Sequence, residues 1–206
     1  MDLRAKILEA ADQLFNERGY KGITMDVLAA HIGISKKTLY QHFENKNDLV
    51  EAVRQRSYDY YYAVFTEIAE TSANAIVAFL RITEILHQIA RNTNPAALYE
   101  MERFFPYAYE SFRTELIARS VQISRQNMER GVSEGLYRAD INLELLPYFR
   151  VETILMGMRD GTLMYEAGGF SLEQISRETT EHFLYGLLTS KGLSVYQELI
   201  ASHPAS

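Results

Sequence analysis

The connection between two short helical segments constrains the fold of this chain more than any other feature. Thr24 is a favoured N-cap residue, and the helical pattern after it ends at Gly33. Ser35 then caps a second short helical pattern. Only Gly33-Ile34-Ser35 separates the two patterns, and so tight a turn between two capped helices is typical of a helix-turn-helix.

The rest of the chain is also predicted to be helical. Apolar residues recur at helical spacing over residues 3–18, and a long helix capped by Asn45 runs to about Glu70. Further helices are expected over residues 74–91, 95–104, 106–135, 142–167, 171–190 and 193–201. No window shows sustained period-two alternation, and 11 Gly and 4 Pro in 206 residues are too few for an all-β sandwich. The fold class is therefore all-α.

The domain organisation follows from these helices. Three short helices fit within the first fifty residues or so, and the long helix that follows contains neither Gly nor Pro. We therefore expect an N-terminal helix-turn-helix domain over residues 1–46. The long helix joins it to a second helical domain over residues 47–206.

The distribution of charge is more informative than its total. The net charge of −6 alone argues against a nucleic-acid partner. Residues 1–56 nevertheless carry a net charge of +1, whereas the remaining residues carry −7. A small basic region on an acidic body favours local contact with phosphate, while the body repels DNA elsewhere.

The second helix of the pair exposes a face that suits DNA. Leu39 and Phe43 are four residues apart and bury one side of it. The residues left on its open face are Lys36, Lys37, Tyr40 and Gln41. The two lysines lie in the first turn, where the helix dipole disfavours cations, so DNA phosphates or guanine edges would compensate for them.

Lys46 repeats this anomaly at the start of the long helix, where its ammonium and the free backbone N–H groups would form a phosphate clamp. Instead of contacting DNA, Lys36 and Lys37 could form an ordinary solvated surface. His42 could likewise cap the helix or pack against it.

The segment from Gly33 to Leu49 resembles the signature of the tetracycline-repressor (TetR) family of transcriptional regulators. So do residues 7–15, the Gly19-Tyr20 break and Ile23-Thr24. The specific match covers about residues 5–53. The remainder is similar to the family only in length and helical character, with a turn at residues 135–140 that resembles a recurrent family turn.

The resemblance implies a homodimer that binds a near-palindromic double-stranded DNA operator, with half-sites about 34–36 Å apart. It assigns base-reading or groove-facing positions to Lys36, Lys37, Tyr40 and Gln41, and phosphate-contacting positions to Thr24, Thr38, Tyr40, His42 and Lys46. Asp26 departs from the family pattern: it should repel phosphate, and we expect it to serve the helix dipole instead. The family's usual mode is repression, relieved by a small-molecule effector.

The acidic body contains many aromatic residues. The candidate pocket residues for an apolar or aromatic effector are Met101, Phe104, Phe105, Tyr107 and Met128, with His87 or Arg103 as polar contacts. Pro106 breaks a helix beside this group. Packing of the same side chains in the core is the alternative, and it is favoured for most of the body's aromatics.

Two long C-terminal helices carry apolar stripes that suit a four-helix dimer interface. The residues are Ile154, Leu155, Met158, Leu163, Phe183, Leu184, Leu187 and Leu188. Packing within one chain explains the same stripes equally well.

No catalytic signature is present. The chain has no Cys nucleophile, no Gly-x-Ser-x-Gly, no Gly-rich phosphate loop and no zinc-type His cluster. Glu178 and His182 are four residues apart on a helix, but they lack a third metal ligand. We therefore expect no enzyme activity, no cofactor and no metal.

The longest stretch without charged side chains, residues 71–80, is too short to span a membrane, and charges in residues 1–15 exclude a signal peptide. No membrane partner is expected, and the predicted location is cytoplasmic, at the nucleoid.

Two other functions remain as alternatives to a transcriptional regulator. The first is a ligand-binding or scaffolding protein whose N-terminal domain packs onto another protein. The second, which the sequence supports less, is a DNA-binding enzyme.

Overall fold

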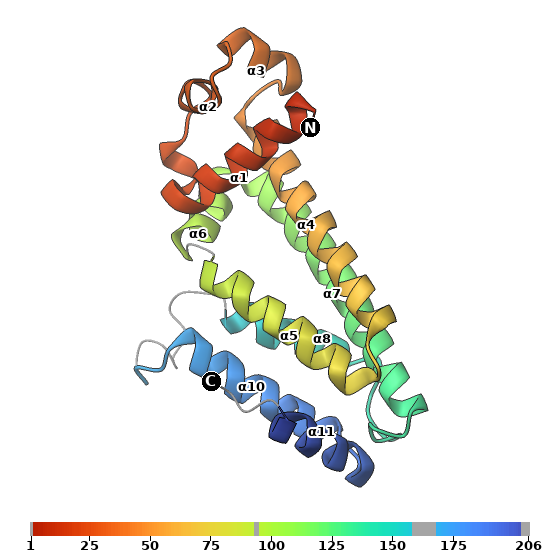
Figure 1. Ribbon diagram of the computed structural model, residues 1–206. Helices are drawn as coiled ribbons and strands as arrows, with labels where there is room; N and C mark the ends of the chain where they lie inside the picture. Colours follow the sequence, from red (N-terminus) through yellow and green to blue (C-terminus); the bar gives the residue numbers. More distant parts are fainter. Residues whose placement is uncertain (1, 93–94, 158–167, 203–206) are drawn as a thin grey trace. The chain divides into compact units, whose positions relative to one another are not determined.

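The computed structural model describes residues 2–92, 95–157 and 168–202, and within these ranges the protein is helical with no β-strand. The helices are α1 (Leu3–Gly22), α2 (Met25–Ile32), α3 (Lys36–His42), α4 (Lys46–Thr71), α5 (Ala75–Asn92), α6 (Pro95–Phe104), α7 (Pro106–Ser133), α8 (Leu146–Gly157), α10 (Leu172–Leu187) and α11 (Ser190–Ser202) (Figure 1). The all-α prediction is confirmed. No described helix is long and apolar enough to span a membrane.

The chain forms two compact units, and these do not divide at residue 46. Unit 1 comprises residues 1–62 and 92–116, and unit 2 comprises residues 63–91 and 117–206. The α6 helix and the first part of α7 thus belong with the helix-turn-helix. Sequence periodicity shows that a helix has an apolar face, but it does not show which partner covers that face, so this grouping was not foreseen.

Unit 1 is built around α1, which lies between the α2–α3 pair and α6 in Figure 1. Its buried residues recur at helical spacing and are Ile7, Leu8, Ala11, Leu14 and Phe15. A kink at Gly19, whose φ of +74° suits glycine, turns the chain so that the ring of Tyr20 stacks on Phe15 at 4.7 Å between ring centres.

Polar contacts fix α4 to the rest of unit 1. Asp12 of α1 pairs with Arg54 of α4, and it also accepts a hydrogen bond from the Ser57 hydroxyl at 3.2 Å. Further along α4, the Tyr58 hydroxyl donates to the carbonyl oxygen of Glu115 in α7 at 3.1 Å. The first part of α4 is therefore anchored on both sides within this unit.

Unit 2 has a separate apolar core. Its buried residues come from α5, α7, the turn after α7, α10 and α11, and include Ile76, Phe79, Met128, Leu136, Tyr137, Phe183, Leu184, Leu187, Leu188 and Tyr196. The turn after α7 uses Gly135 at a φ of +69°. Tyr137 and Leu188 form an isolated antiparallel β-bridge, which fixes this turn to the end of α10.

Arg130 of α7 caps the end of α4 in unit 2. Its guanidinium donates to the carbonyl oxygens of Ala69 and Ser72, each at 2.8 Å, and pairs with Glu134 at 2.7 Å. The final carbonyls of a helix have no partner within the helix, so these bonds satisfy groups that would otherwise need water.

Candidate nucleic-acid interface

The turn between α2 and α3 is built as the sequence predicts. The Thr24 hydroxyl accepts a hydrogen bond from the Val27 N–H at 3.2 Å, and the Ser35 hydroxyl accepts one from the Thr38 N–H at 3.0 Å. Gly33 ends α2 at a φ of +76°. No heavy atom lies within 4 Å of where a Cβ would sit on Gly33, so backbone conformation and not space requires glycine here.

The two faces of α3 divide as expected. Leu39 is fully buried and Phe43, which follows the helix, is 1% exposed, so this side is held in the core of unit 1. The side chains of Lys36, Lys37, Tyr40 and Gln41 are all exposed. Tyr40 is 43% exposed, so much of its ring is available to a partner.

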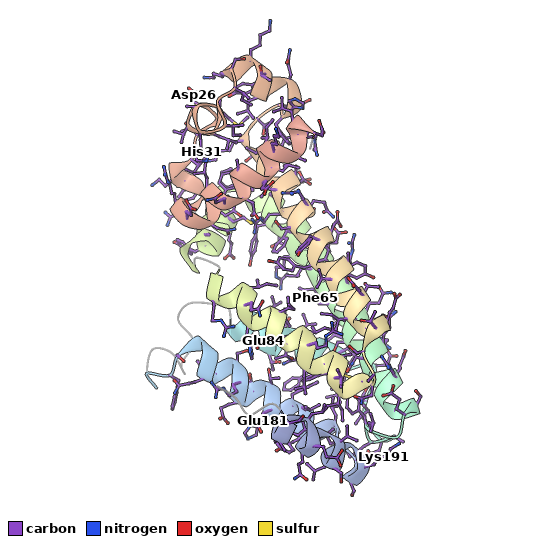
Figure 2. The ribbon with its side chains drawn as sticks, viewed as in Figure 1. Asp26, His31, Phe65, Glu84, Glu181 and Lys191 are labelled. Carbon is purple, nitrogen blue, oxygen red and sulfur yellow. The ribbon has the colours of Figure 1, made fainter. Side chains whose placement is uncertain are left out.

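Lys36 is paired with the acidic residue at the start of α2. Its Nζ lies 2.7 Å from Oδ1 of Asp26, which is labelled on α2 in Figure 2. The hydrogen bond that Lys36 donates to this carboxylate raises the pKa of Lys36 above its ordinary value, so the ammonium keeps its charge. Its Nζ also lies 6.0 Å from the centre of the Tyr40 ring. Asp26 therefore orients Lys36 in addition to occupying the first turn of α2, where the dipole favours a carboxylate.

The other predicted DNA-contacting residues differ in how many hydrogen bonds and ion pairs they make within the protein. Lys37 makes no ion pair with any described residue. The Thr24 hydroxyl accepts its capping bond and so retains its proton as a donor. The Thr38 hydroxyl shares a hydrogen bond with Ser35 at 2.8 Å, and His42 is half-buried in the last turn of α3.

The structure does not place the Lys46 ammonium as a surface clamp. Its Nζ donates to the carbonyl oxygen of Tyr20, just after the Gly19 kink, and lies 5.1 Å from the ring centre of Phe105. Partial burial lowers the pKa of Lys46, and the nearby Glu100 opposes this shift. The physical reason is that the kink frees a carbonyl that needs a donor, and Lys46 is within reach.

A hollow of about 620 Å³ borders α3 where the chain turns into α4. It is lined by Tyr40, Gln41, His42, Phe43, Glu44, Asn45, Asn47, Asp48 and Glu51. Three of these, Glu44, Asp48 and Glu51, are carboxylates, and Asp48 accepts a hydrogen bond from the Glu44 N–H at 3.0 Å.

Arg4 is a candidate that the sequence analysis missed. Its guanidinium lies 5.0 Å from the ring centre of Phe43 at the end of α3, and its side chain is exposed. The available signal was a basic residue in the first turn of α1, where the dipole again disfavours a cation.

The predicted effector-pocket residues are divided between the two units. Met101 and Phe105 are buried in the core of unit 1. Met128 is buried in the core of unit 2, and His87 lies in the same unit. Tyr107 is 90% exposed. Phe104 and Arg103 are exposed on α6, where Arg103 donates to the Tyr99 hydroxyl at 2.8 Å. Core packing, the alternative that the sequence left open, explains the three buried residues.

The predicted dimer residues are similarly divided. Phe183, Leu184, Leu187 and Leu188 are buried within the single chain, in the core of unit 2. Their apolar stripe is thus explained by intramolecular packing. Ile154 and Leu155 are half-buried on α8, and Met158 and Leu163 lie outside the described residues.

The paired Glu178 and His182 show no sign of a metal site. The His182 Nδ1 lies 2.9 Å from the carbonyl oxygen of Glu178 in its own helix. Among the residues that the structure describes, no group of three or more His, Cys, Asp or Glu side chains is placed to hold a metal ion.

Comparison with known proteins agrees with this geometry. The family model described as "Bacterial regulatory proteins, tetR family" matches residues 7–53, which span α1, α2, α3 and the start of α4. The transcriptional repressor KstR2 of Rhodococcus jostii is 26% identical over 188 residues, covering 89% of this chain and 90% of the relative.

Two solved structures show the same fold at lower identity. A TetR transcription regulator from Haloarcula marismortui has a TM-score of 0.75 at 18% identity, covering 90% of this chain and 98% of that one. A protein of Saccharomonospora viridis in complex with choline has a TM-score of 0.73 at 19% identity, covering 90% and 97%. The helix-turn-helix, its exposed basic face and the matched segment together identify residues 7–53 as a helix-turn-helix of the TetR family of transcriptional regulators, and the chain over most of its length is similar to regulators of that family.

Proposed function

We propose that this protein is a repressor that binds a near-palindromic operator as a homodimer and is released by a small-molecule effector. The exposed face of α3 carries the proposal: Lys36, Lys37, Tyr40 and Gln41 are held outward by a fully buried Leu39 on the opposite side. A short helix with this arrangement suits the major groove, where lysine reads guanine edges and an aromatic side chain contacts bases or sugar.

The phosphate contacts in this proposal surround that face. The hydroxyls of Thr24 and Thr38 and the exposed Arg4 supply donors at the starts of α2, α3 and α1. His42 remains a proposed contact at the other end of α3. For Lys46 we propose a contact through the backbone N–H groups at the start of α4, because its ammonium is engaged by Tyr20.

Dimerisation is supported by apolar side chains that unit 2 leaves exposed. Tyr148 and Phe149 on α8 are 52% and 53% exposed, and Tyr185 on α10 is 46% exposed. The α8 and α10 helices pack together, with the rings of Phe149 and Phe183 6.1 Å apart. Water-exposed aromatics on adjacent helices suit an isologous interface between two copies.

Repression and effector release are supported by relatives. KstR2 is named a transcriptional repressor, and the Saccharomonospora viridis structure contains choline. An effector acts only if it binds one state of the dimer better than the other, so saturating effector must change operator affinity.

Selection from random-sequence duplexes tests operator recognition and dimerisation. We expect the enriched sequences to contain two inverted half-sites whose centres are about 34–36 Å apart. Light scattering should show two protein chains, or a multiple of two, bound to each duplex. Enrichment of no sequence, or of a single unrepeated half-site bound by one chain, would contradict it.

A further inference from the structure

The core of unit 2 contains an arginine at an unexpected position. Arg150 of α8 is 5% exposed. Its Nη1 donates to the Thr180 hydroxyl of α10, and its Nη2 donates to the Thr83 hydroxyl of α5, both at 3.2 Å. Both threonines are themselves buried. The guanidinium therefore lies among three helices and is held by two neutral hydroxyls.

Aromatic rings complete its surroundings. The guanidinium carbon lies 4.9 Å from the ring centre of Phe79 and 5.6 Å from that of Phe183. Stacking on aromatic faces suits arginine, but it supplies no counter-charge.

No carboxylate among the described residues pairs with this cation. The acidic residues next to the two threonines, Glu84 and Glu181, are labelled in Figure 2 and have other partners. Glu84 pairs with Arg91 at 3.2 Å, and Glu181 accepts a hydrogen bond from the Tyr196 hydroxyl at 3.5 Å. By contrast, Arg125 and Arg130 of the same unit each have a glutamate partner.

An uncompensated buried charge is costly, and such groups are normally paired. Burial lowers the pKa of Arg150 to about 10, an effect that Tyr137 opposes, so the side chain is still a cation at neutral pH. The two bonds to threonine use two of the five N–H donors of a guanidinium. The remaining donors have no hydrogen-bond partner among the described residues.

We propose that Arg150 is the anion-recognition residue of the effector site in unit 2, and that the effector is a hydrophobic carboxylate. This inference rests on the proposed function, in which a small molecule releases the operator. A guanidinium binds a carboxylate through two parallel hydrogen bonds, which balances its charge. A monoanion with an apolar body fits one cation beside Phe79 and Phe183 better than a phosphate dianion, whose second charge would stay buried and unpaired.

The competing explanation is that Arg150 only ties α5, α8 and α10 together. The two explanations differ in what happens when the charge is removed. If Arg150 binds an anionic effector, its charge has no partner in the ligand-free protein, and Arg150→Met removes that charge. The two threonine hydroxyls can then donate to carbonyls in their own helices. The ligand-free variant should then be as stable as the wild type or more so. If Arg150 is a structural tie, the variant should lose stability.

The experiment uses the full chain and two matched pairs of probes. Titration calorimetry and thermal unfolding are measured with 4-phenylbutyrate against 4-phenylbutanamide, and with decanoate against decanol. We expect wild type to bind at least one acid about tenfold or more tightly than its neutral partner. Arg150→Met should lose this difference, and Arg150→Lys should keep a weaker preference because it retains the charge without the planar fork.

Arg125→Met is the matched control, because it removes a half-buried arginine of the same unit that already has a glutamate partner, and it should leave the preference unchanged. Equal binding of acid and neutral partner by wild type, binding of neither acid, or a destabilised ligand-free Arg150→Met would each overturn the inference. Operator binding by wild type without any probe tests the proposed function separately. Its failure would refute the repressor and leave the carboxylate result standing.

Discussion

Asp26 and Lys36 join the first turns of α2 and α3 through an exposed ion pair, with Oδ1 and Nζ 2.7 Å apart. A carboxylate thus holds one of the lysines on the face that we propose for DNA. The pair orients Lys36 in the free protein, but it also competes with phosphate for the same ammonium. The balance between these two effects decides how Asp26 influences DNA binding.

Replacing Asp26 with asparagine should strengthen binding to nonspecific duplex DNA several-fold. The substitution removes an anion that repels phosphate and frees Lys36 to replace a counterion. The slope of log K against log salt should therefore steepen by about one. Asp26→Glu, which retains the charge, is the control, and fluorescence anisotropy over a salt series is the measurement. Weaker binding by Asp26→Asn would mean that orientation of Lys36 matters more than repulsion.

Lys46→Met should reduce stability and leave the salt slope of DNA binding unchanged. The Lys46 ammonium donates to the Tyr20 carbonyl, and losing this charge-assisted bond should cost about 1 kcal/mol in the free energy of unfolding. Urea unfolding and anisotropy of the same preparation separate the two roles. A slope that falls by about one at unchanged stability would instead place the ammonium on a phosphate.

Gly131→Ala should destabilise unit 2. A Cβ on Gly131 would overlap the ring of Tyr137, which is 1% exposed and cannot move aside without opening the core. Overpacking of this kind costs about 1–3 kcal/mol. Gly186→Ala in α10 is the matched control, because nothing lies within 4 Å of its Cβ position. Helix propensity predicts that this control stabilises by about 0.5–1 kcal/mol. Equal effects of the two substitutions on thermal unfolding would show that the Gly131 backbone does not approach Tyr137.

Tyr137→Phe should change how stability depends on pH above 10. Burial raises the pKa of Tyr137 above its ordinary value of 10, and Glu134 adds to this shift while Arg150 opposes it. The unfolded chain then ionises first as pH rises through 10, so wild type loses up to about 1.4 kcal/mol per pH unit from this group. The variant has no such group. Because it loses the hydrogen bond to Asn127, the variant should have a lower free energy of unfolding than wild type. We expect this difference to shrink between pH 9 and pH 11 in urea unfolding. A constant deficit would contradict the shift.

Local signals in the sequence predicted local structure well. The caps at Thr24, Ser35 and Asn45 are all present, and α6 and α7 begin at Pro95 and Pro106 as expected. Each of these features depends on a few neighbouring residues, through capping bonds or the fixed φ of proline.

The predictions that failed or stayed open depend on contacts between distant segments. Met101 and Phe105 were assigned to an effector pocket because they are aromatic or flexible and lie beside Pro106, but they pack in the core of unit 1. Lys46 was assigned to phosphate, but it reaches Tyr20, 26 residues away. Nothing in the spacing of Arg150 marks it as buried, because its environment is created by Thr83 and Thr180 on other helices.

The exposed face of α3 is the central element of this account, and operator binding by variants of that face tests it most directly. Anisotropy with a selected duplex at two salt concentrations should compare wild type with Lys37→Ala, Tyr40→Ala and Lys191→Ala. Lys191 is an exposed lysine of α11 and controls for the change in net charge. We predict tight, salt-sensitive binding by wild type and Lys191→Ala, and losses of about tenfold or more for each α3 variant. Equal affinity of all four proteins would show that α3 does not read DNA.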